Sequence, residues 1–244
     1  MKALGLSDVG LVRTKNEDSF IVITEPINIL ENLLIVADGM GGHKAGEIAS
    51  SLSVKTFVEH IKNTNFSEEQ ILDNLTDGVR VANYEVLKLS SSNPDFEGMG
   101  TTFTACSIYN NKLYVSHIGD SRLYVINDDG ITQITHDHSY VAEILKSGEI
   151  TKEEAKVHPR RNALTRAIGI SSEVEVDGFL YSLKKGDKVL ICSDGLTDMI
   201  DENEILQIVE NKSLEDGLKE LIYIANKNGG MDNITAILAE IEEV

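Results

Sequence analysis

The chain has 244 residues, of which 41% are hydrophobic and 25% charged, so it can bury a substantial core in the manner of an ordinary globular protein. Its formal net charge of −18 argues against sequence-independent nucleic-acid binding and against docking on an anionic membrane. No apolar run approaches the roughly 20 residues of a membrane span and the N-terminus lacks the apolar region of a signal peptide, so we expect a cytoplasmic protein with no nucleic-acid or membrane partner.

Apolar runs bounded by turn residues predict eight β-strands. Asn110-Asn111 separates two of these runs and is a good two-residue hairpin turn, and Asp128-Asp129-Gly130 is a second turn signal. In chain order the predicted strands are Phe20–Thr24, Leu33–Ala37, Phe103–Tyr109, Lys112–Ile118, Leu123–Ile126, Val174–Tyr181, Lys188–Ser193 and Ile234–Glu240.

Two helical patterns follow the second strand, and two more precede the last one. The first of them, residues 45–61, has an apolar stripe that is less regular than that of the second. Between Ser67 and Ser90 the apolar residues step by three and four behind the capping pattern Ser67-x-x-Gln70. Asp201–Asn211 and Leu214–Asn226 form the second pair. This blockwise order predicts the α+β class, with antiparallel sheets and segregated helices.

Residues from about 138 to 167 interrupt the strands with short, polar, partly helical material. Insertions of this size beside a site are often functional. Only three prolines occur in the chain, and we find no Pro-rich linker and no internal repeat. We therefore expect residues 1–244 to form one domain that carries this excursion.

Acidic residues stand at the ends of several predicted strands. Asp38, Asp120 and Asp194 each follow an apolar run, and Asp232 opens the last strand. A single Asp-Gly after a strand is usually only a turn, but buried carboxylates gathered at one sheet edge repel each other unless a cation lies among them. Hard divalent ions prefer such oxygen ligands, so the pattern predicts a carboxylate-rich metal site.

Two flanking segments fit such a site. Three glycines in residues 38–43 would let the Gly39 carbonyl oxygen approach a metal, although a phosphate cradle is a rival interpretation. Near the N-terminus, Arg13 could grip phosphate oxygens in bidentate fashion, and Asp18 could accept hydrogen bonds from metal-bound water. Read alone, this segment is equally an exposed turn.

Eight blocks of the sequence resemble the metal-dependent Ser/Thr protein phosphatases of type 2C, the PPM family, in its bacterial single-domain form. They occur in the family's order from residue 7 to residue 235, so the resemblance covers essentially the whole chain. The blocks are residues 7–18, 36–43 (VADGMGGH), 98–102 (GMGTT), 117–124 (HIGDSRLY), 137–139 (DHS), 164–169 (LTRAIG), 192–196 (CSDGL) and 230–235 (GMDNIT).

The resemblance implies an α-β-β-α sandwich of two antiparallel sheets flanked by helix pairs. It implies two Mn²⁺ or Mg²⁺ ions bridged by Asp38, with the Gly39 carbonyl on the first ion and with Asp194 and Asp232 on the second. Bacterial members often show a third ion, which Asp120 and Asp194 would hold here. Arg13 matches the phosphate-binding arginine, and Asp18 would act through water.

The sequence departs from the eukaryotic members at one position. They place a histidine two residues after the bridging aspartate as a candidate general acid, whereas this chain has Met40, which cannot donate a proton. His43 follows three residues later and is an alternative donor, or only a residue at the start of a helix. The excursion at 138–167 corresponds to the family's flap, where His158, Arg160 and Arg161 could engage acidic or phosphorylated substrate segments.

The expected activity is hydrolysis of phosphoserine and phosphothreonine on intracellular proteins by metal-activated water. The protein would oppose a Ser/Thr protein kinase and act as a monomer. Cys106 and Cys192 lie inside apolar runs, so neither resembles the activated thiolate of a cysteine-based phosphatase. Two alternatives remain open at this stage: a metal-dependent phosphoesterase for small molecules, and a regulatory module that binds metal without catalysis.

Overall fold

Two five-stranded antiparallel sheets lie face to face in the computed structural model, which describes residues 1–41 and 45–242. One sheet has the strand order β1-β12-β11-β8-β9, and the other has the order β10-β7-β6-β3-β2. A short ladder, β4-β5, lies beside them. The strands are β1 (Lys2–Asp8), β2 (Ser19–Ile23), β3 (Leu33–Ala37), β4 (Gly39–Met40), β5 (Gly100–Thr101), β6 (Phe103–Tyr109), β7 (Lys112–Ile118), β8 (Arg122–Asn127), β9 (Gly130–Gln133), β10 (Asp177–Ser182), β11 (Lys188–Cys192) and β12 (Ile234–Glu240).

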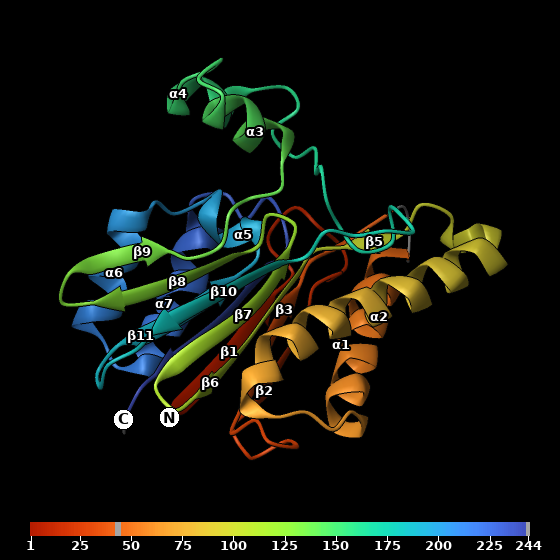
Figure 1. Ribbon diagram of the computed structural model, residues 1–244. Coiled ribbons are helices and arrows are strands. Elements are labelled where there is room, and N and C mark those ends of the chain that lie inside the picture. The colour runs from red at the N-terminus through yellow and green to blue at the C-terminus, as the bar shows by residue number, and fades with distance from the viewer. Residues whose placement is uncertain (42–44, 243–244) are drawn as a thin grey trace.

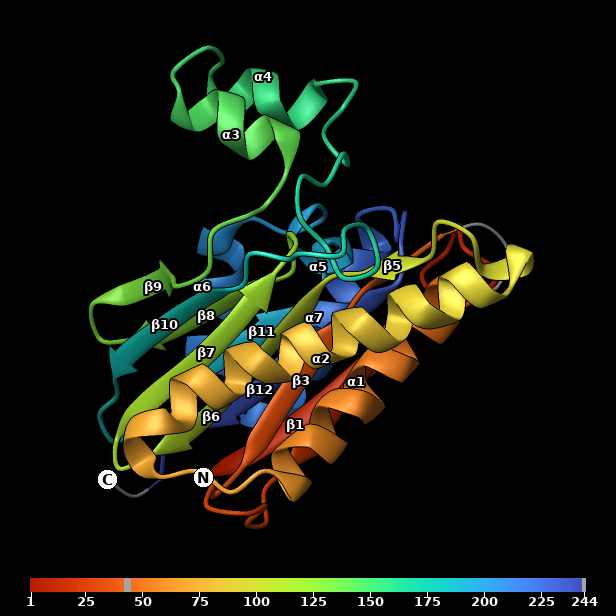
Figure 2. The same ribbon diagram turned by 45° about the vertical axis from the view of Figure 1, so that its right-hand side comes forward.

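Helices cover the outer face of each sheet. The long helices α1 (Ala45–Asn63) and α2 (Ile71–Ser92) bury Phe57 and Leu75 against the sheet that contains β3. On the other side, α5 (Asp194–Thr197), α6 (Glu202–Asn211) and α7 (Leu214–Lys227) pack on the sheet that contains β11. Figure 2 shows α1 and α2 as an outer layer over β3, β6 and β7. The expected α-β-β-α sandwich is confirmed.

The core between the two sheets is built by apolar side chains that alternate along the strands. Val36, Val125 and Ile237 belong to this central cluster, whereas Ile35 on β3 points to the opposite face and packs under α1 and α2. Because successive side chains of a strand point to opposite faces, strands that are buried on both faces read as continuous apolar runs. This burial on both faces gives the central strands the apolar runs from which the sequence predicts them.

Local turn and cap chemistry follows the sequence at the predicted points. The Ser67 amide donates to Gln70 Oε1 at 3.1 Å, in a 3₁₀ turn η1 (Glu68–Gln70) that leads into α2. Asp201 caps α6 by accepting from the Glu204 amide at 3.0 Å. Asn110 and Asn111 have positive φ angles of 46° and 61°, as a tight hairpin turn requires. A second 3₁₀ turn, η2 (Pro94–Phe96), follows α2.

Some elements differ from the sequence prediction. Strands β1 and β9 and the short β4-β5 ladder were not predicted. Strand β10 begins at Asp177 rather than at Val174, because Val174 packs against the α1/α2 cluster without a strand partner. The helix expected from Ser67 begins as η1 and becomes α2 at Ile71.

The excursion at 138–167 forms two short helices, α3 (Tyr140–Lys146) and α4 (Lys152–Val157). Both stand away from the sandwich at the end of two stems, as Figures 1 and 2 show from two directions. We call residues 138–167 the flap.

Cys106 on β6 and Cys192 on β11 are free and fully buried. Burial raises the pKa of Cys192 to about 12 and that of Cys106 also far above its usual range. Neither thiol can therefore ionise readily. Among the described residues, no helix combines the length and the apolar character that crossing a membrane would require.

Candidate active site

A cavity of about 230 Å³ opens where the ends of strands from both sheets meet. Its walls include six of the residues that the sequence singled out: Arg13, Asp38, Gly39, Asp120, Asp194 and Asp232. The remaining lining residues are Glu17, Met40, Gly41, Thr102, Asn162 and Leu164. Residues more than 200 positions apart in the chain therefore share one site.

The topology explains why these carboxylates meet. Strands β3 and β7 both pair antiparallel with β6, so they run in the same direction, and their carboxyl ends carry Asp38 and Asp120 to one edge. In the facing sheet β11 pairs antiparallel with β12, so the end of β11 lies beside the start of β12. Asp194 and Asp232 occupy these two positions.

The backbone of Asp38 is fixed by three hydrogen bonds. Its amide donates to the Thr102 hydroxyl at 2.9 Å, and its carbonyl accepts from the Thr102 amide at 2.9 Å and from the Thr101 hydroxyl at 2.8 Å. Thr101 and Thr102 are almost completely buried. The backbone of Asp38 is thus held in place by the protein itself, which limits the positions that its carboxylate can take.

Two positions in the site require glycine because the backbones approach closely. A Cβ on Gly39 would lie 2.2 Å from the carbonyl oxygen of Gly46 and 2.4 Å from that of Glu17. A Cβ on Gly195 would lie 2.0 Å from the carbonyl oxygen of Asn233. These contacts bring the segments that carry Asp38, Asp194 and Asp232 together.

Asn233 organises the N-terminal loop that carries Arg13. Its side-chain amide donates to the carbonyls of Val9 and Lys15 at 2.9 and 2.8 Å, and its Oδ1 accepts from the Glu17 amide at 2.8 Å. Arg13, which is half exposed, forms an ion pair with Asp232 at 2.7 Å between Nη2 and Oδ2. The predicted phosphate-binding residue and one predicted metal ligand therefore contact each other in this structure.

The buried carboxylates strongly affect one another. Burial raises the pKa of Asp38 well above its usual range, and the charges of Asp18, Asp194 and Asp120 raise it further. Burial, together with Asp120, raises the pKa of Asp194 in the same way. The pKa of Asp18 is raised to about 6 and that of Asp120 to about 7, in both cases chiefly by burial. The chain itself supplies too little positive charge to this cluster.

The oxygen atoms present fit a pair of hard divalent cations. The carboxyl groups of Asp18 and Asp194 lie beside that of Asp38, close enough to share a proton or a cation. Oδ1 of Asp18 and Oδ1 of Asp194 are buried without any hydrogen-bond partner. Buried polar atoms are nearly always satisfied in native proteins, so these two atoms indicate a missing electropositive ligand. Mg²⁺ and Mn²⁺ prefer all-oxygen sites of this kind.

The carboxylates expected to bind metal are close together but are not arranged around one point. Among residues 1–41 and 45–242, no three Asp, Glu, His or Cys side chains surround a common position as ligands of a bound ion do. The ion pair of Asp232 with Arg13 contributes to this, because it directs Asp232 toward the guanidinium. Asp18 lies beside Asp38 and also accepts a hydrogen bond from the Ser193 hydroxyl at 2.9 Å.

The three basic flap residues do not line the cavity. The guanidinium of Arg160 stacks on the ring of Tyr140 at 3.8 Å, and its amide donates to His158 Nδ1 at 3.1 Å. The ring of His158 lies 5.7 Å from that of Tyr140, so both residues face the flap's own helix α3. Arg161 is exposed, and its charge is close enough to Asp198 to oppose the rise in the pKa of Asp198 that burial causes. Asn162 and Leu164 are the flap residues that reach the cavity.

The two residues considered for the role of general acid are Met40, which cannot donate a proton, and His43. Met40 lies on the cavity wall and packs against Gly100. His43, the alternative general acid, lies outside the described residues.

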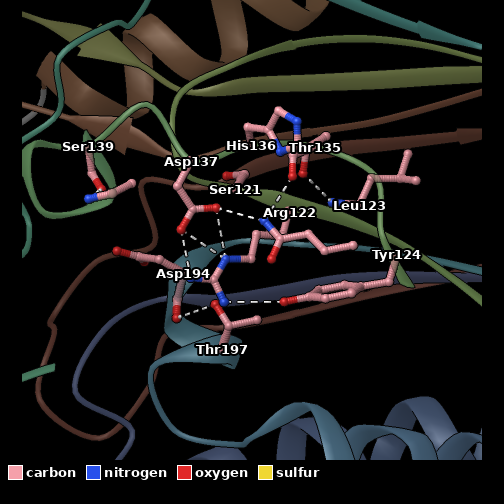
Figure 3. A network of polar contacts seen from close by, with 12 residues as sticks. Ser121, Arg122, Leu123, Tyr124, Thr135, His136, Asp137, Ser139, Asp194 and Thr197 are labelled. Carbon is pink, nitrogen blue, oxygen red and sulfur yellow. Dashed lines mark hydrogen bonds and ion pairs between the residues drawn. The ribbon is translucent and has the colours of Figure 1, made fainter. Parts of the chain in front are cut away.

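Sequence reasoning missed a polar network beside Asp120. Arg122 donates to both carboxylate oxygens of Asp137, at 2.6 Å from Nη2 and 2.9 Å from Nε, and to the Tyr124 hydroxyl at 3.2 Å. Figure 3 shows the Arg122 side chain between Asp137 and Tyr124, with Asp194 close by. In the sequence, Asp137 stands out only as part of the block at 137–139. An arginine two residues after Asp120 was the signal that could have identified the network.

Asp198 is a second residue that was overlooked. Its charge raises the pKa of both Asp120 and Asp194, so it belongs to the same electrostatic field. Its own pKa is raised by burial, and Arg122 and Arg161 oppose that rise. The signal was its place four residues after Asp194, one turn along the helical segment that begins there.

Comparisons with known proteins agree with this geometry. The model of a family described as "Protein phosphatase 2C" matches residues 13–239. The serine/threonine phosphatase stp of Listeria monocytogenes is 40% identical over 237 residues, which are 96% of this chain and 93% of that protein.

Solved structures give the same result. A crystal structure of a bacterial serine phosphatase superposes with a TM-score of 0.94 at 36% identity, covering 100% of this chain and 99% of that one. The catalytic domain of the serine threonine protein phosphatase PstP, in complex with two manganese ions, has a TM-score of 0.86 at 36% identity, covering 99% of this chain and 98% of that one.

Proposed function

Because the chain belongs to the protein phosphatase 2C family, we propose for it the activity that its relatives are named for, removal of phosphoryl groups from serine and threonine side chains of proteins. It is a metal-dependent hydrolase. The observation that carries this conclusion is the convergence of four aspartates from both sheets on one cavity that also contains Arg13. Two of these aspartates, Asp38 and Asp194, would repel each other strongly without a divalent cation.

Each carboxylate has a place in the proposed metal centre. Asp38 would bridge two Mn²⁺ or Mg²⁺ ions, with the Gly39 carbonyl on the first ion and Asp194 and Asp232 on the second. Asp120 and Asp194 would hold a third ion. A related catalytic domain is described with two manganese ions, which supports the pair. Bound ions of this kind polarise phosphoryl oxygens and lower the pKa of water toward neutrality.

The protein's own residues then orient the reaction. Arg13 can leave Asp232 and present its planar fork to two phosphoryl oxygens, since its side chain is half exposed. Asp18, with its free Oδ1, could accept a hydrogen bond from the attacking water and so orient it. Met40 donates no proton, so the leaving serine or threonine oxygen must be protonated from another source.

We extend the proposal to the setting of the enzyme. Residues 1–244 form one phosphatase domain with the flap at 138–167, and the protein works as a monomer in the cytoplasm against a Ser/Thr protein kinase. The exposed Arg161 and the neighbouring His158 and Arg160 would attract acidic or phosphorylated substrate segments to the flap. Support for phosphoprotein substrates comes from the named relatives.

Kinetics with matched substrates test the function. The purified chain is assayed with Mn²⁺ on a phosphothreonine peptide, a sugar phosphate and an aryl phosphate, each with chelator or with chelator preloaded with Mn²⁺. We expect hydrolysis of the peptide and the aryl phosphate, little hydrolysis of the sugar phosphate, and loss of activity only with the free chelator.

Three outcomes would contradict the proposal. Preference for the sugar phosphate would favour the small-molecule phosphoesterase. No turnover of any substrate would favour the regulatory module. Full activity in free chelator would reject the metal mechanism itself.

A further inference from the structure

The flap meets the sandwich at a base where its two stems are hydrogen-bonded to each other. The Thr165 amide donates to the His138 carbonyl at 2.8 Å, and the Tyr140 amide donates to the Ala163 carbonyl at 2.8 Å. Figures 1 and 2 show helices α3 and α4 standing away from the sandwich, with these two stems joining them to it. The orientation of the whole flap therefore depends on what holds the base.

One carboxylate outside the flap contacts both stems. Asp177, the first residue of β10, lies with Oδ2 3.2 Å from His138 Nε2 and with Oδ1 3.0 Å from Arg166 Nη1. His138 is the first residue of the flap, and Arg166 is one residue from its end. Only 6% of the His138 side chain and 27% of the Asp177 side chain are exposed, so this contact is shielded from water.

The hydrogen bonds around His138 define its tautomer. The Gly119 amide can only donate, and it points at His138 Nδ1 at 3.1 Å, so Nδ1 is the acceptor. The proton of the neutral ring is then on Nε2, which donates to Asp177. Burial lowers the pKa of His138, in agreement with a neutral ring. All polar atoms of this ring are satisfied in one specific orientation.

The base is also linked to the strand ends that carry the cavity. The His138 amide donates to the Gly119 carbonyl at 2.7 Å, and Gly119 directly precedes Asp120. On the other stem, Ile168 and Thr101 exchange two backbone hydrogen bonds of 2.9 and 3.1 Å. Thr101 in turn donates to the Asp38 carbonyl. These backbone hydrogen bonds do not involve the Asp177 side chain, so they keep the strand ends at the cavity in place when that side chain is lost.

We propose that Asp177 is a positioning residue of the enzyme: by holding His138 and Arg166 together, it fixes the flap so that Asn162 and Leu164 form the rim over which a protein substrate must lie. This inference rests on the proposed function. A small aryl phosphate needs only Arg13 and the carboxylates, whereas a phosphopeptide extends past the rim. Loss of Asp177 therefore affects peptides selectively.

The test compares two substrates in an Asp177→Ala variant. We expect kcat/KM for a phosphothreonine peptide to fall about 10-fold, because small misplacements of positioning groups cost up to about 100-fold in rate. Turnover of an aryl phosphate should change little. Hydrogen exchange should become faster in residues 138–167 and stay unchanged in α1 and α2.

Two variants separate positioning from general damage. Asp187→Ala removes another buried aspartate, which accepts from the Lys184 amide at 2.9 Å in the turn between β10 and β11, beyond the opposite end of β10 from Asp177. It should lower stability while affecting both substrates equally. Asp177→Asn keeps an oxygen acceptor for Arg166 or His138 and should recover most of the peptide activity. If the alanine variant does not fold, Arg166→Ala breaks the contact with Asp177 from the other side and carries the test, with the same selective loss expected on the peptide.

The coupling itself can be measured. Because Asp177 and Arg166 act together, the Asp177→Ala/Arg166→Ala double variant should be no worse on the peptide than the more damaging single variant. Equal losses on peptide and aryl phosphate, or unchanged exchange in the flap of Asp177→Ala, would overturn the inference. If the unaltered enzyme does not hydrolyse the peptide, the proposed function fails, and the exchange measurement still decides the role of Asp177.

Discussion

A paired aspartate, Asp137, and a cluster of three aspartates lie near the same cavity, and their charged neighbours are of opposite sign. Asp137 faces the Arg122 guanidinium, with 2.6 Å between Nη2 and Oδ2. Asp38, Asp18 and Asp194 face mainly one another. The same side chain is thus used once as half of an ion pair and once as part of an uncompensated cluster. The charge of Asp137 is neutralised by an arginine of the chain, whereas the charges of the cluster have no such partner and would need a cation from solution.

The pKa shifts in the two groups reflect this difference. Burial alone would lower the pKa of Arg122, but the contact with Asp137 outweighs it, and the pKa is raised well above its usual range. In the Asp38 group burial and like charges both act in the same direction, and the pKa values are raised. A pair of this kind is electrically balanced within the chain, whereas the cluster is not, and it is the site that we propose for the cations.

Replacing one carboxylate of the cluster should have the largest effect on activity. We expect Asp38→Asn to lower kcat on an aryl phosphate by roughly 10³-fold, because several kcal/mol of transition-state stabilisation by the metals depend on it. In chelator the same variant should melt at a higher temperature than the unaltered protein, since a repelling charge is gone. Melting curves recorded by differential scanning fluorimetry check this. A lower melting temperature in chelator would show that Asp38 is a structural residue.

Breaking the ion pair of Asp137 with Arg122 should destabilise the protein instead of stabilising it. Asp137→Ala leaves the Arg122 guanidinium, only 28% exposed, without its partner and should cost about 3 kcal/mol of unfolding free energy. Urea unfolding of metal-loaded protein measures the cost. Asp128→Ala, in the exposed turn after β8, is the matched control and should be nearly neutral. Stability equal to that of the control would mean that the pair contributes nothing.

A buried group that carries no charge gives the smallest effect. His117 lies between the Thr104 hydroxyl at 2.9 Å and the His136 carbonyl at 3.1 Å, and burial lowers its pKa from 6.5 to about 4. The unfolded chain therefore binds a proton below pH 6.5 that the folded chain rejects until about pH 4. Stability is lost as the pH falls through this window, by about 2 kcal/mol between pH 7 and pH 5.

Comparison with His117→Gln isolates this contribution from that of the carboxylates. Urea unfolding at pH 7 and at pH 5 should show a larger loss for the unaltered protein than for the variant. Equal losses would mean that His117 can be protonated inside the fold.

Much of the fold could be predicted from the sequence, because its strands are buried on both faces. Leu33–Ala37 and Lys188–Cys192 are such strands, and they form β3 and β11. Strand β1 escaped notice because its inward residues include the small Ala3 and Gly5, whereas Leu4 and Leu6 point outward and are 40% and 36% exposed. Pattern reasoning detects large apolar side chains and overlooks strands that pack through small ones.

The carboxylates of the site could be predicted for a related reason, but their contacts could not. Carboxylates at strand ends gather at one edge of a sandwich, which is how Asp38 and Asp194 could be placed together. The contact of Arg13 with Asp232 joins residues 219 positions apart, and no local pattern encodes it. The two contacts of Asp177 likewise depend on the way the flap stems return to the sheet. Contacts of this kind arise from packing and become visible only in three dimensions.

The deep burial of both thiols has a consequence for the conditions under which the enzyme works. Phosphatases that attack with a cysteine are silenced when peroxide converts the thiolate to a sulfenic acid. Cys106 and Cys192 are inaccessible to such oxidants and remain protonated at any physiological pH. Peroxide concentrations that inactivate a cysteine-dependent phosphatase should therefore not reduce the phosphatase activity of this protein.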